Sequence, residues 1–151
     1  MIGAVANGAQ LAAVVVDASV SVSWVLKEQS ESSLAESLFL QGHRGVRALW
    51  VPCFWLWECG NVMLTYRKQK HIAEPDVPEL LRIFRYPAIL FDAPPDVSIQ
   101  AQTIQIAYST GLSYYDASYI ELAQRKNAEL ATFDQAMKTA ARGLGITCLD
   151  L

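Results

Sequence analysis

The stretch VVVDAS at residues 14–19 carries the strongest structural signal in the chain. Its three valines are β-branched and apolar, which is typical of a strand buried on both faces of a parallel sheet. Asp17 follows the last valine, so we expect it at the carboxyl end of that strand. Residues 19–26 are expected to form a short helix. The stretch therefore predicts the first strand-to-helix unit of an α/β domain.

Short apolar strands and helices alternate along the rest of the chain. Further strands are expected at residues 48–51, 88–91, 129–132 and 146–149, and helices at residues 30–40, 54–70, 75–84, 97–109, 113–126 and 135–142. Gly42 is expected to stop the first of these helices. The pattern predicts a single α/β domain over residues 14–151, with a mainly parallel central sheet flanked by helices, after a loose N-terminal extension at residues 1–13.

Composition limits the class of protein. Of the 151 residues, 52% are hydrophobic and 18% are charged, which suits one buried core and not a disordered chain. Fifteen acids against twelve bases give a net charge of −3. This balance argues against a general nucleic-acid coat protein, but it leaves open an enzyme that meets nucleic acid at one site.

Nothing in the sequence favours export or a membrane. The first basic residue is Lys27, whereas a secretory signal needs an early positive region. The apolar stretch at residues 9–26 is about as long as a membrane span, but a charge at its middle, Asp17, is costly in lipid. The cysteines, Cys53, Cys59 and Cys148, form no zinc or disulfide pattern. We expect a soluble, cytoplasmic protein.

Acidic residues fall where parallel sheets usually place chemistry, beyond the carboxyl ends of strands. Asp17 and Asp134 each follow an expected strand, and Asp116 lies in the first turn of the helix after Ser113. Each also has a structural interpretation. Asp17 and Asp134 could cap the next helix, and Asp116 fits a capping box with Ser113.

Glu58 is harder to explain structurally. It lies in a helix that is apolar nearly all round, where a carboxylate is usually paired, metal-bound or at the edge of a pocket. Asn61 lies three residues further on and shares its face of the helix. The nearby Trp50, Trp55 and Trp57 are expected in the core and a dimer interface rather than as a platform for stacking bases.

Taken together, the four acids suggest a metal site. Carboxylates about 4 Å apart repel by roughly 4 kcal/mol per pair at an effective dielectric near 20, so a cluster needs protons or a divalent cation. Oxygen ligands alone suit Mg²⁺ or Mn²⁺ rather than zinc. The chemistry typical of such a site is hydrolysis of a phosphodiester.

The sequence resembles PIN-domain ribonucleases of the VapC toxin type, the toxin half of bacterial and archaeal toxin–antitoxin pairs. The motifs that carry the resemblance are VVVDAS (14–19), WECGNV (57–62), LSYYDA (112–117), YIELA (119–123) and ATFD (131–134). Their order and spacing match the family from about residue 14 to residue 151. The extension at residues 1–13 and the region 75–95 depart from the family pattern.

The resemblance implies a function and a site. It implies an Mg²⁺-dependent endoribonuclease toxin, with Mn²⁺ as a substitute, that acts as a homodimer on RNA and is inhibited by a VapB-like antitoxin. The implied catalytic and metal-binding residues are Asp17, Glu58, Asp116 and Asp134, and the implied supporting residues are Ser19, Asn61 and Thr132.

Other functions stay open or are disfavoured. A PIN module without activity, or one outside toxin systems, could act in RNA binding or RNA processing. A haloacid-dehalogenase phosphatase needs a second aspartate at the position of Ser19. A receiver domain needs an acid pair at the end of the first strand, but Val16 precedes Asp17. It also needs a lysine after the last strand, but no basic residue follows Ile146.

Overall fold

The computed structural model describes residues 12–26 and 33–151. Its centre is a sheet of four parallel strands in the order β3-β2-β1-β4. The strands are β1 (Ala13–Val16), β2 (Ala48–Val51), β3 (Ile89–Phe91) and β4 (Glu129–Ala131). The expected mainly parallel α/β sheet is confirmed, and every pairing between these strands is parallel.

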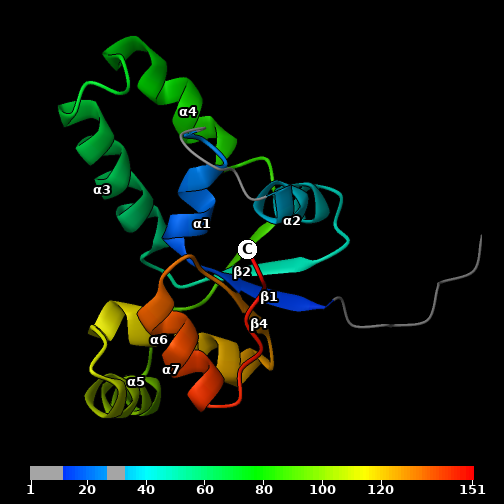
Figure 1. The fold of residues 1–151 in the computed structure, drawn as a ribbon, viewed down its shortest axis with the longest axis vertical. Helices are drawn as coiled ribbons and strands as arrows, with labels where there is room; N and C mark the ends of the chain where they lie inside the picture. The colour runs from blue at the N-terminus through cyan, green and yellow to red at the C-terminus, as the bar shows by residue number, and fades with distance from the viewer. Residues whose placement is uncertain (1–11, 27–32) are drawn as a thin grey trace, which may run out of the picture.

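Helices cover both faces of the sheet (Figure 1). One layer holds α1 (Ala18–Ser23), α2 (Ser33–His43), α3 (Trp55–Lys68), the short 3₁₀ turn η1 (Glu74–Asp76) and α4 (Val77–Ile83). The other layer holds α5 (Val97–Thr110), α6 (Tyr114–Lys126) and α7 (Gln135–Gly143). In Figure 1, α3 and α4 extend together away from the sheet, so that only the first turns of α3 lie close to the strands.

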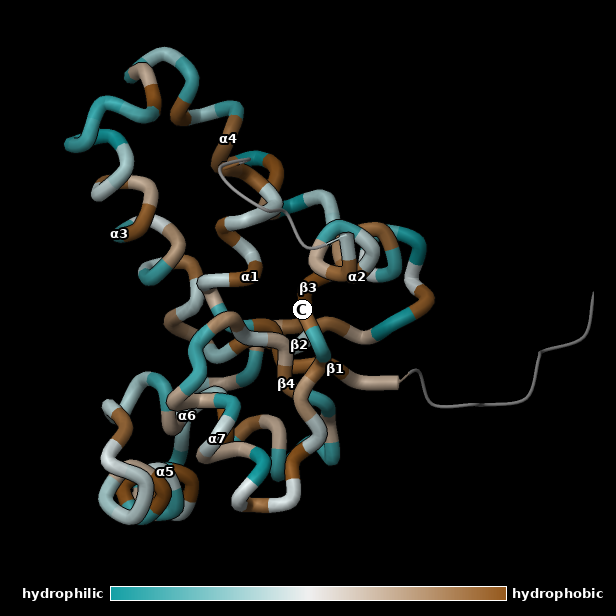
Figure 2. The backbone as a smooth tube through the Cα atoms, in the orientation of Figure 1, coloured by the Kyte–Doolittle hydropathy of each residue, from teal (hydrophilic) through white to brown (hydrophobic). Residues whose placement is uncertain are grey.

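The three valines of β1 form the middle of the core. Val14, Val15 and Val16 are fully buried, because β1 has a strand on each side and helices above and below it. Apolar segments gather where the strands lie in Figure 2. Helix α6 packs on β1 and β4 through its buried face, which includes Ala117 and Ile120. The valine run is therefore the inner strand that its composition predicted.

Three local expectations need correction or adjustment. The segment 146–149 forms no strand, because it contributes only one parallel bridge, Leu130 with Cys148. Gly42 lies inside α2 rather than after it. A Cβ at that position would come within 2.3 Å of the Leu49 side chain, so the glycine allows α2 to approach β2 closely. Ala13, expected in the extension, is the first residue of β1.

Some expectations lie outside the described residues. These are residues 1–11 of the N-terminal extension and residues 30–32 of the second expected helix. Among the described residues, no helix is both long and apolar enough to cross a membrane.

Candidate active site

Asp17 and Thr132 meet because β1 and β4 are parallel neighbours in register. Val16 pairs with Ala131, so the next residue of each strand emerges at the same edge of the sheet. The backbone N–H of Asp17 donates to the carbonyl of Ala131 at 2.9 Å, which continues the ladder by one step. At the carboxyl end of the sheet, the Asp17 carboxylate therefore lies beside the Thr132 hydroxyl group.

The Asp17 side chain is held by hydroxyl groups and does not cap α1. Asp17 occupies the N-cap position of α1, but its side chain makes no capping hydrogen bond. Instead, its Oδ2 accepts from Ser19 Oγ at 2.6 Å and from Thr132 Oγ1 at 2.8 Å. The capping interpretation of Asp17 is therefore wrong, and the structure places the hydroxyl groups of Ser19 and Thr132 against its carboxylate.

Burial raises the pKa of Asp17. Only 7% of the residue is exposed, and loss of hydration disfavours the ionised carboxylate. The nearby charge of Asp116 also raises the pKa, while the hydrogen bonds from Ser19 and Thr132 lower it. The net effect is an upward shift of the pKa, so the fold makes the ionised form of this carboxylate less favourable than it is in water.

Glu58 is brought to the same region by packing at the start of α3. Trp55, fully buried one turn earlier, donates from Nε1 to Ser21 Oγ at 3.0 Å, and Ser21 Oγ in turn donates to the carbonyl of Asp17 at 3.2 Å. This chain of hydrogen bonds joins α3 to α1. Burial raises the pKa of Glu58, and the charges of Asp17 and Asp116 raise it further.

Tyr119 is a site residue that sequence reasoning did not single out. Its hydroxyl donates a hydrogen bond to Glu58 Oε2, although 61 residues separate the two. The bond lowers the pKa of Glu58 and thus works against burial. Tyr119 itself is fully buried, and its own pKa lies well above the usual range because of that burial and the charge of Glu58. The available signal was spacing, since Tyr119 follows Asp116 by one helical turn.

Asp116 and Asp134 occupy helix starts. Ser113 caps α6 by accepting from the backbone N–H of Asp116 at 3.1 Å, which places the Asp116 carboxylate in the first turn. Asp134 caps α7, because its Oδ1 accepts from the backbone N–H of Met137 at 2.8 Å. The capping interpretation thus accounts for one oxygen of Asp134. Unlike Asp116, Asp134 is not among the charges that raise the pKa of Asp17 or Glu58.

A further acid at this edge of the sheet is already held in an ion pair. Asp92 follows β3, and its Oδ2 lies 2.6 Å from Nη2 of Arg125. Arg125 also binds the buried Glu121 at 2.8 Å, and these hydrogen bonds raise its pKa. In contrast, no ion pair between described residues involves Asp17, Glu58 or Asp116.

The carboxylates at this edge of the sheet suit a hard divalent cation that keeps several of its water molecules. Within the described part of the chain, no three acidic, histidine or cysteine side chains are grouped closely enough to hold an ion between them. Mg²⁺ does not need such a cage, because it usually keeps several waters and takes one or two carboxylates. Asp17, Glu58 and Asp116 have no ion-pair partner among the described residues, and a cation bound beside them would relieve the repulsion that raises the pKa of Asp17 and of Glu58.

A pocket of about 810 Å³ opens beside Glu58. Trp57, Glu58 and Asn61 of α3 line one side of it, together with Phe54 and Tyr115. Asn61 therefore lies at this pocket rather than among the groups that bind Asp17. The expectation for the tryptophans is confirmed for Trp55 in the core, but Trp57 is 74% exposed.

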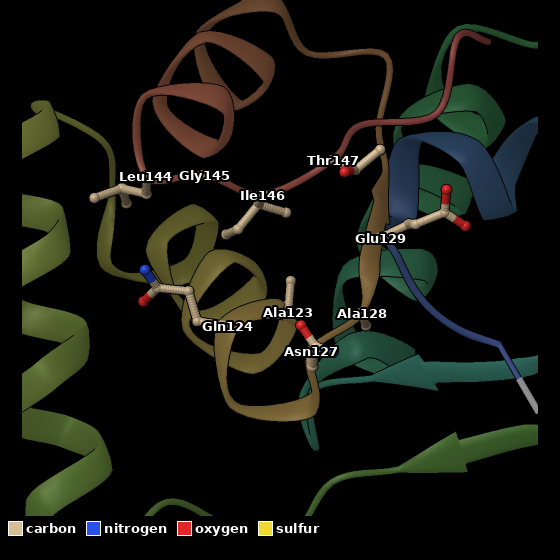
Figure 3. A pocket seen from close by; sticks show the side chains of 9 residues that line it. All are labelled: Ala123, Gln124, Asn127, Ala128, Glu129, Leu144, Gly145, Ile146 and Thr147. Carbon is tan, nitrogen blue, oxygen red and sulfur yellow. The ribbon is translucent and has the colours of Figure 1, made fainter. Parts of the chain in front are cut away.

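A second pocket, of about 320 Å³, lies at the other end of the sheet (Figure 3). It is formed by the end of α6, the start of β4 and residues 144–147. Glu129 at its rim is paired with Arg47 at 2.7 Å. Because this pocket lies at the amino end of β4, it is separate from the acids that follow the strands.

Comparison with known proteins agrees with this fold. A family model described as "PIN domain" matches residues 14–143. The solved structure of PAE2754 from Pyrobaculum aerophilum has a TM-score of 0.66 and 19% identity, covering 91% of this chain and 85% of that chain. FitAcB from Neisseria gonorrhoeae has a TM-score of 0.57 and 20% identity, covering 91% of this chain and 96% of that chain. No curated protein matches the chain.

Proposed function

The chain belongs to the PIN domain family, whose members are generally nucleases, and from this premise we propose that it is an Mg²⁺-dependent endoribonuclease. The observation that carries the proposal is the buried carboxylate of Asp17. It is held by two hydroxyl groups, has no basic partner among the described residues, and is electrostatically coupled to Glu58 and Asp116. Such a group is unfavourable in the fold unless it serves a cation.

Asp17, Glu58 and Asp116 would hold the cation, and Asp134 would contribute the carboxylate oxygen that does not cap α7. When bound, Mg²⁺ would lower the pKa of a water molecule and stabilise negative charge on the phosphate. Ser19 and Thr132 orient Asp17 by donating to one of its oxygens, which leaves the other available. Tyr119 does the same for Glu58. These hydroxyl groups favour the ionised carboxylates that a metal requires.

The test is cleavage of RNA by the purified protein with Mg²⁺, with Mn²⁺ and with EDTA. Asp17→Asn and Asp116→Asn should each abolish cleavage and weaken Mn²⁺ binding measured by calorimetry. Asp76→Asn, which changes an exposed acid in η1, is the matched control and should change neither. Cleavage that persists in EDTA, or in both site variants, would refute the proposal. RNA binding without cleavage would instead support a PIN module that acts in RNA binding or processing.

The finer assignment is a toxin controlled by a VapB-like antitoxin, acting as a homodimer in the cytoplasm where cellular RNA is found. It rests on the motif order that resembles VapC toxins. Expression of the chain should arrest bacterial growth, and Asp17→Asn should relieve the arrest. Co-expression of a small protein that is encoded by an adjacent gene and binds the chain should restore growth of cells that express the wild-type chain. Normal growth at high expression would contradict the toxin role while leaving the nuclease activity open.

A further inference from the structure

The pocket beside Glu58 exposes two large aromatic rings. Trp57 is 74% exposed and Tyr115 is 58% exposed, and both line the pocket. Tyr115 is nevertheless held in place, because Phe54 packs edge-on against it with ring centroids 5.1 Å apart. A positioned ring that stays in solvent offers a flat apolar face to a ligand.

The polar groups of the pocket are neutral or acidic. Asn61 follows Trp57 by one helical turn, so its carboxamide can both donate and accept beside the indole ring. Glu58 only accepts when it is ionised. No lysine, arginine or histidine is among the described residues that line the pocket. The chemistry therefore suits a planar, uncharged ring with polar edges rather than a phosphate group.

The pocket is also continuous with the acidic site. Glu58 belongs to both, and Ala18, which lines the pocket, directly follows Asp17. A nucleotide whose phosphate lay at the acids would therefore have its base, or that of its neighbour, at the pocket.

We propose that this pocket binds one unstacked base of the RNA substrate, which stacks on Trp57 and Tyr115 and forms hydrogen bonds with Asn61. The subsite rests on the nuclease function proposed above. It makes Trp57, Tyr115 and Asn61 determinants of base preference near the scissile bond. Stacking on an aromatic side chain is tolerant of base identity, whereas the carboxamide adds a preference.

The test uses binding without chemistry. Single-stranded RNA decamers of uridine carry 2-aminopurine at one position in turn and are titrated with the Asp17→Asn protein. At one position, stacking should quench the 2-aminopurine fluorescence. Trp57→Ala and Tyr115→Ala, each added to Asp17→Asn, should weaken binding about ten-fold and remove the quenching, while Trp57→Phe should retain most of both. Tyr108→Ala in α5, where the side chain is 88% exposed, is the matched control and should bind normally.

A second measurement uses active protein and RNA randomised at each position around the cleavage site. Asn61→Ala should flatten the base preference at one position. Unchanged affinity, quenching and preference in the Trp57 and Tyr115 variants would overturn the subsite, even if Asp17→Asn abolishes cleavage. Variants that change only the oligomeric state, measured by sedimentation, would overturn it too, since the pocket would then be covered by protein. If the wild-type protein cleaves no RNA but the Trp57 and Tyr115 substitutions still remove the quenching, the subsite is supported and the nuclease function is rejected.

Discussion

The hydroxyl oxygen of Thr132 lies 2.8 Å from Oδ2 of Asp17, although 115 residues separate the two in the chain. The parallel register of β1 and β4 places them side by side, and Thr132 is fully buried at that point. Thr132 Oγ1 also accepts from the backbone N–H of Asp134 at 3.0 Å. One buried side chain thus links two of the proposed metal ligands.

Asp17→Asn is expected to stabilise the metal-free protein. The substitution removes a buried charge, and the amide oxygen can still accept from Ser19 and Thr132. A gain on the order of 1 kcal/mol would raise Tm by about 2–4 °C in a domain of this size. Thermal unfolding in EDTA measures the change. A lower Tm for Asp17→Asn would mean that the carboxylate stabilises the fold without metal.

Stability of the metal-free wild type is expected to fall as pH rises from about 4. The pKa of Asp17 is raised above its ordinary value of 3.8 and that of Glu58 above 4.5, so the folded state holds these protons more tightly than the unfolded state does. The stabilisation is present below the ordinary values and is lost as pH rises through the raised ones. Urea unfolding between pH 4 and pH 8 in EDTA should show a smaller decline for Asp17→Asn than for the wild type.

Tyr119→Phe should move the acid limb of the activity profile to higher pH. The change removes the hydroxyl that lowers the pKa of Glu58 but keeps the ring that packs on Phe54. Loss of a hydrogen bond to a charged group costs about 1.5–3 kcal/mol, so the acid limb should move up by roughly one to two pH units, with activity lost on its acid side and recovered at higher pH. Tyr108→Phe is the control. A uniform loss at all pH values would show that the hydroxyl does not act through ionisation of Glu58.

Thr132→Val should destabilise the protein by about 1–3 kcal/mol, because it leaves the buried Asp17 oxygen and the Asp134 N–H short of a partner. Thr132→Ser should restore most of this loss, since it keeps the hydroxyl. Thr139→Val is the matched control, because the exposed Thr139 hydroxyl bonds only within its own helix α7. Urea unfolding of the three variants gives the comparison. Equal stability of the Val and Ser variants would show that the hydroxyl contributes little.

Asp134 can be tested for two separate roles. Asp134→Ala removes the cap of α7 and should cost about 1 kcal/mol of stability, whereas Asp134→Asn should keep the cap. If the carboxylate also binds metal, Asp134→Asn will remain stable but will lose Mn²⁺ affinity and cleavage. Calorimetry and unfolding on the same preparations separate the roles. Full activity in Asp134→Asn would restrict Asp134 to capping.

The alternation of short apolar runs and helices was sufficient to predict the sheet and its helices. It failed at the segment 146–149, where apolar composition resembles that of a strand but only Cys148 bridges to β4. It also misjudged Gly42, whose role depends on Leu49 across the helix–sheet contact. Both failures concern contacts between segments, which local composition does not report.

By itself, the sequence determined the α/β class, the buried strand at residues 14–16 and the acids that follow strands or begin helices. These depend on local periodicity, turn residues and chain order. Only the tertiary structure decided which of the acids lie close enough for the charge of one to change the pKa of another. The charge of Asp116 raises the pKa of both Asp17 and Glu58, whereas Asp92 forms an ion pair with Arg125. The Tyr119–Glu58 bond and the exposed faces of Trp57 and Tyr115 were likewise decided by packing between α3 and α6. The physical reason is that burial and Coulomb interactions depend on distances in space, and residues far apart in the chain acquire those distances only on folding.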